Sequence, residues 1–160
     1  MGVTSERTLE GNNVAAMPLP NSDELVGLLP HRPPFRFVDS VEAFEAGSSI
    51  EARYHVTGSE AFLAGHFPGN PVLPGVIQLE AHAQAGAIAV LADDRYAGRL
   101  PLFGGVEKVR WRRIVRPGDD LVLALTLDRL SARGGWGQGT ARVDGATACQ
   151  ARLFFAFADA

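Results

Sequence analysis

The chain has 160 residues, of which 46% are hydrophobic and 21% are charged, and its formal net charge is −3. This length suits one globular domain with a proper core, and the acidic balance argues against general nucleic-acid binding. The single cysteine, Cys149, excludes an intramolecular disulfide and is typical of a reducing compartment. We therefore expect a cytoplasmic protein in which Cys149 packs in the core. The four histidines show no metal-ligand spacing, so no metal site is expected.

The chain begins with a polar segment, residues 1–21, that has no apolar stretch typical of a secretory signal. We interpret it as a mobile leader before a single domain over residues 22–160. A short capped helix is predicted over residues 23–29, and Pro30 would end it.

A β-hairpin is predicted next. Residues 31–34 (His-Arg-Pro-Pro) form a stiff turn into a strand over residues 35–41. Alternation of apolar and polar residues resumes over residues 50–56, after a turn at residues 46–48. His55 falls on the second strand and is interpreted as a surface or strand-pairing residue.

The centre of the chain is a constrained loop followed by an apolar helix. Prolines and glycines over residues 65–75 restrict the backbone and permit close approaches. Residues 76–92 are apolar nearly all round, which is typical of a buried helix, and Glu80 is their only formal charge. Polar residues interrupt a segment already short for a bilayer, so it is not interpreted as a membrane span.

Two side chains of this stretch suggest acid–base chemistry. A buried carboxyl group keeps its proton more readily than one in water, so Glu80 could donate a proton. His66, at the mouth of the loop, is the natural base. The N–H groups of Gly75, Val76 and Ile77 begin the helix and could bind a developing negative charge. Gln84, one turn after Glu80, could orient its carboxyl group.

The second half of the chain is predicted to be mostly strand. Strands are expected over residues 102–115, 121–127, 136–143 and 147–157, with a type I′ turn at Asp144-Gly145. With the hairpin, this gives about six strands and two helices. An α+β fold is therefore predicted, in which an antiparallel sheet curls around the long helix.

A basic strip lies within residues 107–116. This segment contains five cationic side chains and one acidic side chain, so its net charge is +4. The rest of the chain must then carry −7. Such a strip is typical either of a docking site for an acidic partner or of an edge strand protected by charge. Its members are Lys108, Arg110, Arg112, Arg113 and Arg116.

The sequence HFPGNPVLPGV followed by LEAHAQ resembles the signature of the hot-dog-fold 3-hydroxyacyl-(acyl carrier protein) dehydratases of the FabZ type. The resemblance continues in LLPHRPPFRFVD (residues 28–39) and FGGVEKVRWRRIVRPGD (residues 103–119), and covers roughly residues 23–158. It implies that His66 and Glu80 catalyse dehydration of a (3R)-hydroxyacyl chain, without a metal or redox cofactor, and that the basic strip docks acyl carrier protein.

The resemblance also implies further roles. The Gly75 N–H would bind the thioester oxygen, with Gln84 and Val76 supporting the site. An acyl tunnel would involve Phe67, Ile88 and Phe103. Because related enzymes take the histidine and the glutamate of one site from different subunits, an obligate dimer is implied; a trimer of dimers and a heterodimer with a paralogue stay open.

Two further histidines receive structural interpretations. His31 is a candidate for a second catalytic histidine, but the resemblance gives its motif a packing role, which is the interpretation preferred here. His82 stands where the family commonly has an apolar residue, about 200° around the helix from Glu80. It is interpreted as a core or interface residue, with a specialised branch acting on polyketide or polyene intermediates as the alternative.

Three other functions remain compatible with the sequence. A hot-dog thioesterase would hydrolyse the same kind of thioester, and an (R)-specific enoyl hydratase would act on coenzyme A substrates. The third is a non-catalytic partner subunit of a dehydratase, against which the presence of both His66 and Glu80 argues.

Overall fold

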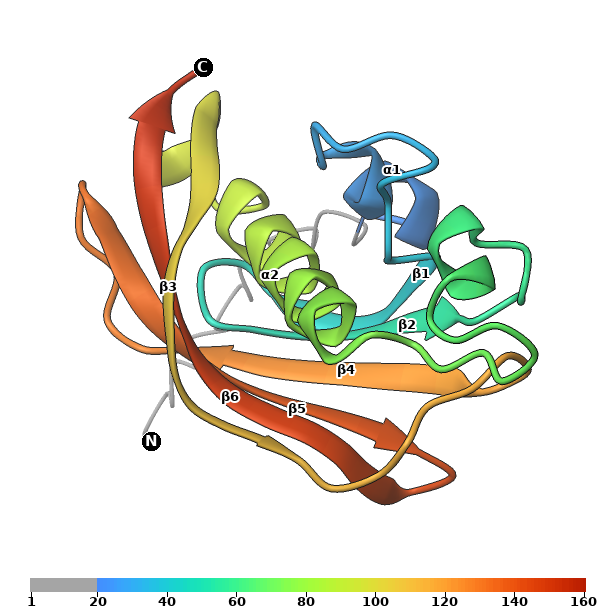
Figure 1. Cartoon of the computed structure of the whole chain (residues 1–160). Coiled ribbons are helices and arrows are strands. Elements are labelled where there is room, and N and C mark those ends of the chain that lie inside the picture. Colours follow the sequence, from blue (N-terminus) through green and yellow to red (C-terminus); the bar gives the residue numbers. More distant parts are fainter. Residues whose placement is uncertain (1–19) are drawn as a thin grey trace, which may run out of the picture.

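The computed structural model describes residues 20–160. Its helices and strands, shown in Figure 1, are α1 (Ser22–Gly27), β1 (Ser40–Glu45), β2 (Ser49–His55), α2 (Gly75–Leu91), β3 (Arg99–Trp111), β4 (Asp120–Leu127), β5 (Gly134–Val143) and β6 (Ala146–Asp159). Two short 3-10 turns lie at Ala61–Ala64 and Asp94–Tyr96.

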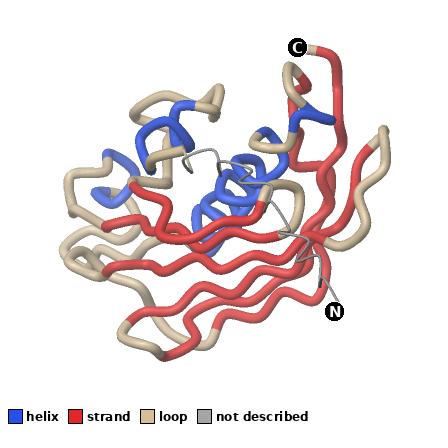
Figure 2. Tube along the Cα trace, turned by 180° about the vertical axis from the view of Figure 1, so that it is seen from behind, coloured by secondary structure: helices blue, strands red, loops and turns tan. Residues whose placement is uncertain are grey.

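The six strands form one sheet in the order β1-β2-β4-β5-β6-β3, and every neighbouring pair is antiparallel. The sheet curves around α2, which lies in its hollow (Figure 1), and the view from behind shows the strands crossing beneath the helix (Figure 2). Alternate residues of β4 point to the helix and are buried, as strand geometry requires: Leu121, Leu123, Leu125 and Leu127. The predicted α+β, hot-dog arrangement is confirmed.

Helix α2 is buried over most of its length, as its sequence predicts. It approaches the sheet closely because small residues stand at the contacts. A methyl group on Gly86 would overlap the Phe155 ring, and one on Gly139 of β5 would overlap the His82 ring. Within residues 20–160, no helix is both long and apolar enough to cross a bilayer.

The predicted strand over residues 35–41 is wrong over residues 35–39, because β1 begins only at Ser40. The Phe37 N–H donates to Gln84 Oε1 over 2.7 Å, and the Phe35 carbonyl accepts from Gln84 Nε2 over 3.1 Å. These backbone groups are therefore satisfied by a helix side chain instead of a neighbouring strand. Phe37 and Val38 are almost completely buried by this docking.

The predicted strand over residues 102–115 is also displaced, since β3 covers Arg99–Trp111. The chain leaves the sheet after Trp111 and crosses to the loop that precedes α2, where Val115 accepts a backbone hydrogen bond from Leu73 over 2.8 Å. This departure from the strand pattern brings residues 113–116 beside the loop of His66.

The remaining predicted boundaries agree to within two residues; the helix expected over residues 23–29, for example, covers Ser22–Gly27. Asp144 and Gly145 have φ values of 50° and 77°, as a type I′ turn requires, which confirms that hairpin. The predicted leader, residues 1–21, lies outside the described residues except for its last two. Asn21 caps α1 in a capping box with Glu24.

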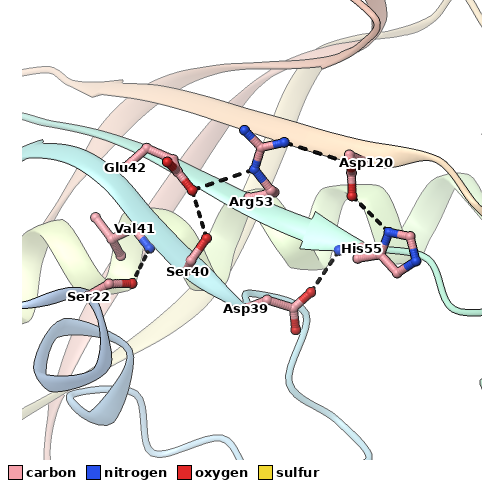
Figure 3. Close-up of polar contacts among 8 residues, drawn as sticks. All are labelled: Ser22, Asp39, Ser40, Val41, Glu42, Arg53, His55 and Asp120. Atoms are coloured by element: carbon pink, nitrogen blue, oxygen red, sulfur yellow. Dashed lines mark hydrogen bonds and ion pairs between the residues drawn. The ribbon is translucent and has the colours of Figure 1, made fainter.

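A polar network on the strands β1, β2 and β4 ties α1 and the edge of the sheet together (Figure 3). His55 Nδ1 lies 2.8 Å from Asp120 Oδ1, and the His55 N–H donates to Asp39 over 2.7 Å. Ser22 accepts from the Val41 N–H over 2.8 Å, which fixes α1 on β1. His55 is half exposed, and its interpretation as a surface and strand-pairing residue is confirmed.

Candidate active site

His66 is held by its own loop. Its Nδ1 lies 2.8 Å from the Val72 carbonyl oxygen. A carbonyl only accepts hydrogen bonds, so Nδ1 must carry the proton, and in the neutral ring Nε2 keeps a free lone pair. The ring stacks on Phe67, with 4.2 Å between the ring centroids. The loop therefore holds His66 in the tautomer whose unprotonated Nε2 can act as a general base.

Backbone hydrogen bonds make this loop rigid. Phe67 and Asn70 exchange two of them, at 3.0 and 2.9 Å, and the Val72 N–H donates to the His66 carbonyl over 2.8 Å. Gly69 has a φ of 69°, which a residue with a side chain adopts only under strain. From outside, Arg116 Nη1 donates to Asn70 Oδ1 over 2.7 Å and to the Pro71 carbonyl over 3.3 Å.

An apolar pocket of about 400 Å³ opens beside His66. Trp111 forms one wall, and its indole N–H donates to the Gly75 carbonyl over 3.2 Å. A Cβ on Gly75 would lie 2.6 Å from the indole, so only glycine permits this close approach. This role of Trp111 was not predicted, although a large aromatic residue inside a basic strip was a usable signal. The other apolar wall residues are Val72, Leu73, Pro74, Val76, Ile114 and Val115.

The N-terminus of α2 also lines this pocket, through Gly75 and Val76. Ile77, expected to have a free N–H, donates instead to the Pro74 carbonyl over 3.0 Å. Within residues 20–160, the N–H groups of Gly75 and Val76 have no hydrogen-bond acceptor. Together with the positive end of the helix dipole, they can bind a carbonyl oxygen that develops negative charge.

Glu80 lies one turn further along α2 and is 19% exposed. Its Oε1 accepts from Gln84 Nε2 over 3.0 Å, so the contact expected between these two side chains is present. The Gln84 amide cannot be reversed, because its own oxygen accepts from the Phe37 N–H. Gln84 therefore presents a hydrogen-bond donor to Glu80.

His31, to which the sequence analysis gave a packing role, also lies against Glu80. Its Nε2 is 3.4 Å from Glu80 Oε1. Its ring stacks loosely on Phe35, with 6.4 Å between the ring centroids. The sequence analysis missed the contact because it depends on how the segment before β1 docks on α2, a long-range feature that no local pattern encodes.

The structure does not bring all the predicted site residues together. Glu80 does not line the pocket beside His66, and no hydrogen bond or ion pair joins these two residues within the described chain. Ile88, on α2, is completely buried, and Phe103 lies partly exposed on β3; neither lines that pocket. Phe67 is close to His66 through ring stacking.

His82 lies on the face of α2 opposite Glu80 and is completely buried against β5. Its Nδ1 is 2.8 Å from the Gln78 carbonyl oxygen. Burial lowers the pKa of His82, because a charged imidazolium would lose its hydration there. The core interpretation of His82 is confirmed.

Cys149 is completely buried on β6. Burial raises its pKa to about 11, so the thiol stays protonated near neutral pH. The structural interpretation of this cysteine is confirmed.

The basic strip divides into two groups. Arg113 and Arg116 bond to the protein itself: Arg113 reaches the Val143 carbonyl and Asp144, and Arg116 reaches the loop of His66. Lys108, Arg110 and Arg112 are exposed and have no carboxylate partner within residues 20–160. The second group leaves its charge available to a partner.

Comparisons with known proteins identify the family of the chain. Residues 29–152 match the family model of the FabA-like domain. The chain is 54% identical to the 3-hydroxyacyl-(acyl carrier protein) dehydratase FabZ of Oenococcus oeni, over 82% of this chain and 95% of the relative. It is 50% identical to FabZ of Latilactobacillus sakei, over 84% and 96%.

Among solved structures, the fold is similar to that of the dehydratase heterocomplex ApeI:P from Xenorhabdus doucetiae, with a TM-score of 0.70 and 19% identity, over 84% of this chain and 91% of that one. At this identity the likeness shows the fold alone. The matched family model and the identity to its members over nearly their whole length decide the assignment: the chain belongs to the FabA-like family, among the dehydratases of the FabZ type.

Proposed function

We propose that this protein is a hydro-lyase that dehydrates (3R)-hydroxyacyl chains carried on acyl carrier protein to trans-2-enoyl chains. The observation that carries the proposal is His66, which presents a free Nε2 beside an apolar pocket that ends at the N-terminus of α2. That combination suits removal of a proton next to a thioester carbonyl. It fits the activity for which the curated relatives are named.

In the proposed reaction, His66 Nε2 takes the proton from C2 of the substrate. The thioester oxygen takes up negative charge and is stabilised by the Gly75 N–H. A double bond then forms between C2 and C3 as the C3–O bond breaks. The departing oxygen receives the proton of Glu80 and leaves as water. These proton transfers use side chains alone and require no metal or redox cofactor.

We further propose that the complete site forms between two copies of the chain. This accounts for the separation of His66 and Glu80 within one chain, described above. β3 is an edge strand of the sheet and exposes large apolar side chains, namely Leu102, Phe103 and Val106. Because an exposed apolar edge favours pairing with another strand, we propose the apolar part of β3, residues 102–106, as the contact of a homodimer, which leaves the basic end of the strand accessible. A heterodimer with a paralogue could use the same edge, whereas a trimer of dimers would need a second contact besides it.

Acyl carrier protein is the proposed macromolecular partner. Lys108, Arg110 and Arg112 offer an exposed positive surface, which suits an acidic carrier. Replacing Arg110 and Arg112 by Glu should raise KM for carrier-protein substrates about tenfold at low salt. It should leave KM for a short pantetheine thioester unchanged, and equal effects on both substrates would remove the docking role. A cytoplasmic location is proposed with this partner.

The function is tested by incubating the full chain with 3-hydroxyacyl carrier proteins of several chain lengths and following the loss of one water by mass spectrometry. The wild type should dehydrate, whereas His66→Ala and Glu80→Gln should each retain the fold and lose at least about a thousandfold in kcat. Release of free carrier thiol would instead identify a thioesterase. Preference for coenzyme A substrates would identify an enoyl hydratase.

Mixing the two variants tests the shared site. After random exchange of subunits, half of the dimers pair one variant with the other, and each such dimer has one intact site of two. Activity should therefore recover to about a quarter of the wild-type value. Two inactive variants that stay inactive when mixed and exchanged would contradict a site shared between subunits.

A further inference from the structure

Glu80 holds its carboxyl group in an asymmetric environment. Both neighbouring nitrogens, Gln84 Nε2 at 3.0 Å and His31 Nε2 at 3.4 Å, lie against the same oxygen, Oε1. Neither approaches Oε2 within these distances. The two oxygens of the acid are therefore distinguished by the protein before any substrate binds.

His31 is oriented toward this oxygen by its surroundings. Its Nδ1 is buried and has no hydrogen-bond partner within residues 20–160. A buried N–H without an acceptor is rare and costly, so the neutral ring places its proton on Nε2, the nitrogen that faces Glu80. Arg32 binds the His31 carbonyl over 2.8 Å and the Leu29 carbonyl over 2.6 Å, which fixes the backbone of this turn.

We infer that His31 is a positioning residue for Glu80, acting as a second N–H donor to Oε1. An oxygen that accepts two hydrogen bonds is a poor place for the acid proton, so the proton of Glu80 is carried on Oε2. Oε2 is then the oxygen that donates to the leaving hydroxyl. At 3.4 Å this contact is not a formed hydrogen bond; it becomes one when the two groups move closer, as catalytic contacts do when a substrate binds.

This inference rests on the proposed function, in which Glu80 is the acid. It assigns to His31 a role in the rate of proton donation and none in binding the acyl chain. Loss of the donor should therefore lower kcat and leave KM nearly unchanged.

A matched pair of variants separates the hydrogen bond from packing. Methionine and glutamine have nearly the same length and volume, but only glutamine carries an N–H. His31→Met should lower kcat about tenfold, the loss expected for one hydrogen bond to a reacting group, with KM within twofold. His31→Gln should restore kcat to within about threefold of the wild type.

The measurement uses the full chain and the 3-hydroxyacyl carrier protein that the wild type dehydrates, with the fold of each variant checked by circular dichroism. If His31→Met does not fold, His31→Ala replaces it in the same comparison with His31→Gln. A wild-type kcat without the donor, or equal losses in both variants, would overturn the inference. Because the wild type and Glu80→Gln are measured alongside, a failure of the dehydratase assignment itself would be seen separately, as an inactive wild type.

Discussion

His66 and Glu80 are positioned in opposite ways. His66 is held by the carbonyl of Val72, only six residues away, and by a loop that proline and glycine restrict. Glu80 is held by Gln84 and His31, and Gln84 is itself fixed by Phe35 and Phe37, 49 and 47 residues away. The base therefore depends on local chain stiffness, whereas the acid depends on the docking of a distant segment.

This difference has an energetic consequence. A stiff local loop loses little entropy when it folds, so single external contacts add little to its order. A docked segment is ordered only by the contacts that hold it. Removing one such contact, for example that of Gln84, should therefore lower stability more than removing an external contact of the stiff loop. The comparison is tested by substitutions that remove one stabilising contact from the His66 loop and one from the segment docked on Gln84.

The largest effect is expected for Gln84→Met, which keeps the side-chain volume and removes both polar atoms. The buried Phe37 N–H and the Phe35 carbonyl then lose their partner. The free energy of unfolding should fall by about 2–4 kcal/mol, as expected for two backbone groups left unpaired. Denaturant unfolding measures the loss, and a change below about 0.5 kcal/mol would show that the segment does not depend on Gln84.

An intermediate effect, dependent on pH, is expected on the opposite face of α2. Since burial lowers the pKa of His82, the unfolded chain binds a proton there more readily than the folded chain. Above the unfolded-state pKa of about 6.5, His82 should not lower the free energy of unfolding. Below that pH, the free energy of unfolding should fall by up to about 1.4 kcal/mol per pH unit.

His82→Met should remove this contribution and flatten the dependence of unfolding free energy on pH between about pH 6.5 and 5. Measurement of both proteins at about pH 8, where the histidine is neutral in both states, gives the packing cost of the substitution alone. Parallel slopes in the acidic range would mean that His82 does not limit acid stability.

The smallest effect is expected for Arg116→Met, which removes the external support of the His66 loop. His66 keeps its bond to Val72, and the loop keeps its own backbone bonds. The free energy of unfolding should fall by less than about 1 kcal/mol, and kcat should fall only a few fold. A loss as large as that of Gln84→Met would remove the distinction between the two regions.

Much of this protein was determined by its sequence alone. The proline and glycine spacing, the one charge in an apolar helix and the type I′ turn each act over a few residues, so His66, Glu80, α2 and the last hairpin could be predicted. The α+β class and the antiparallel sheet around the long helix followed from the pattern of elements and from the family motifs, whereas the order of the strands in the sheet came only from the structure.

Tertiary structure decided the features that depend on long-range contact. Residues 35–39 look like a strand, but the Gln84 amide satisfies their backbone from across the core. The same docking carries His31 onto Glu80, and the end of β3 places Trp111 over Gly75. No local pattern encodes these contacts, because each joins α2 to a segment at least 36 residues away in the chain.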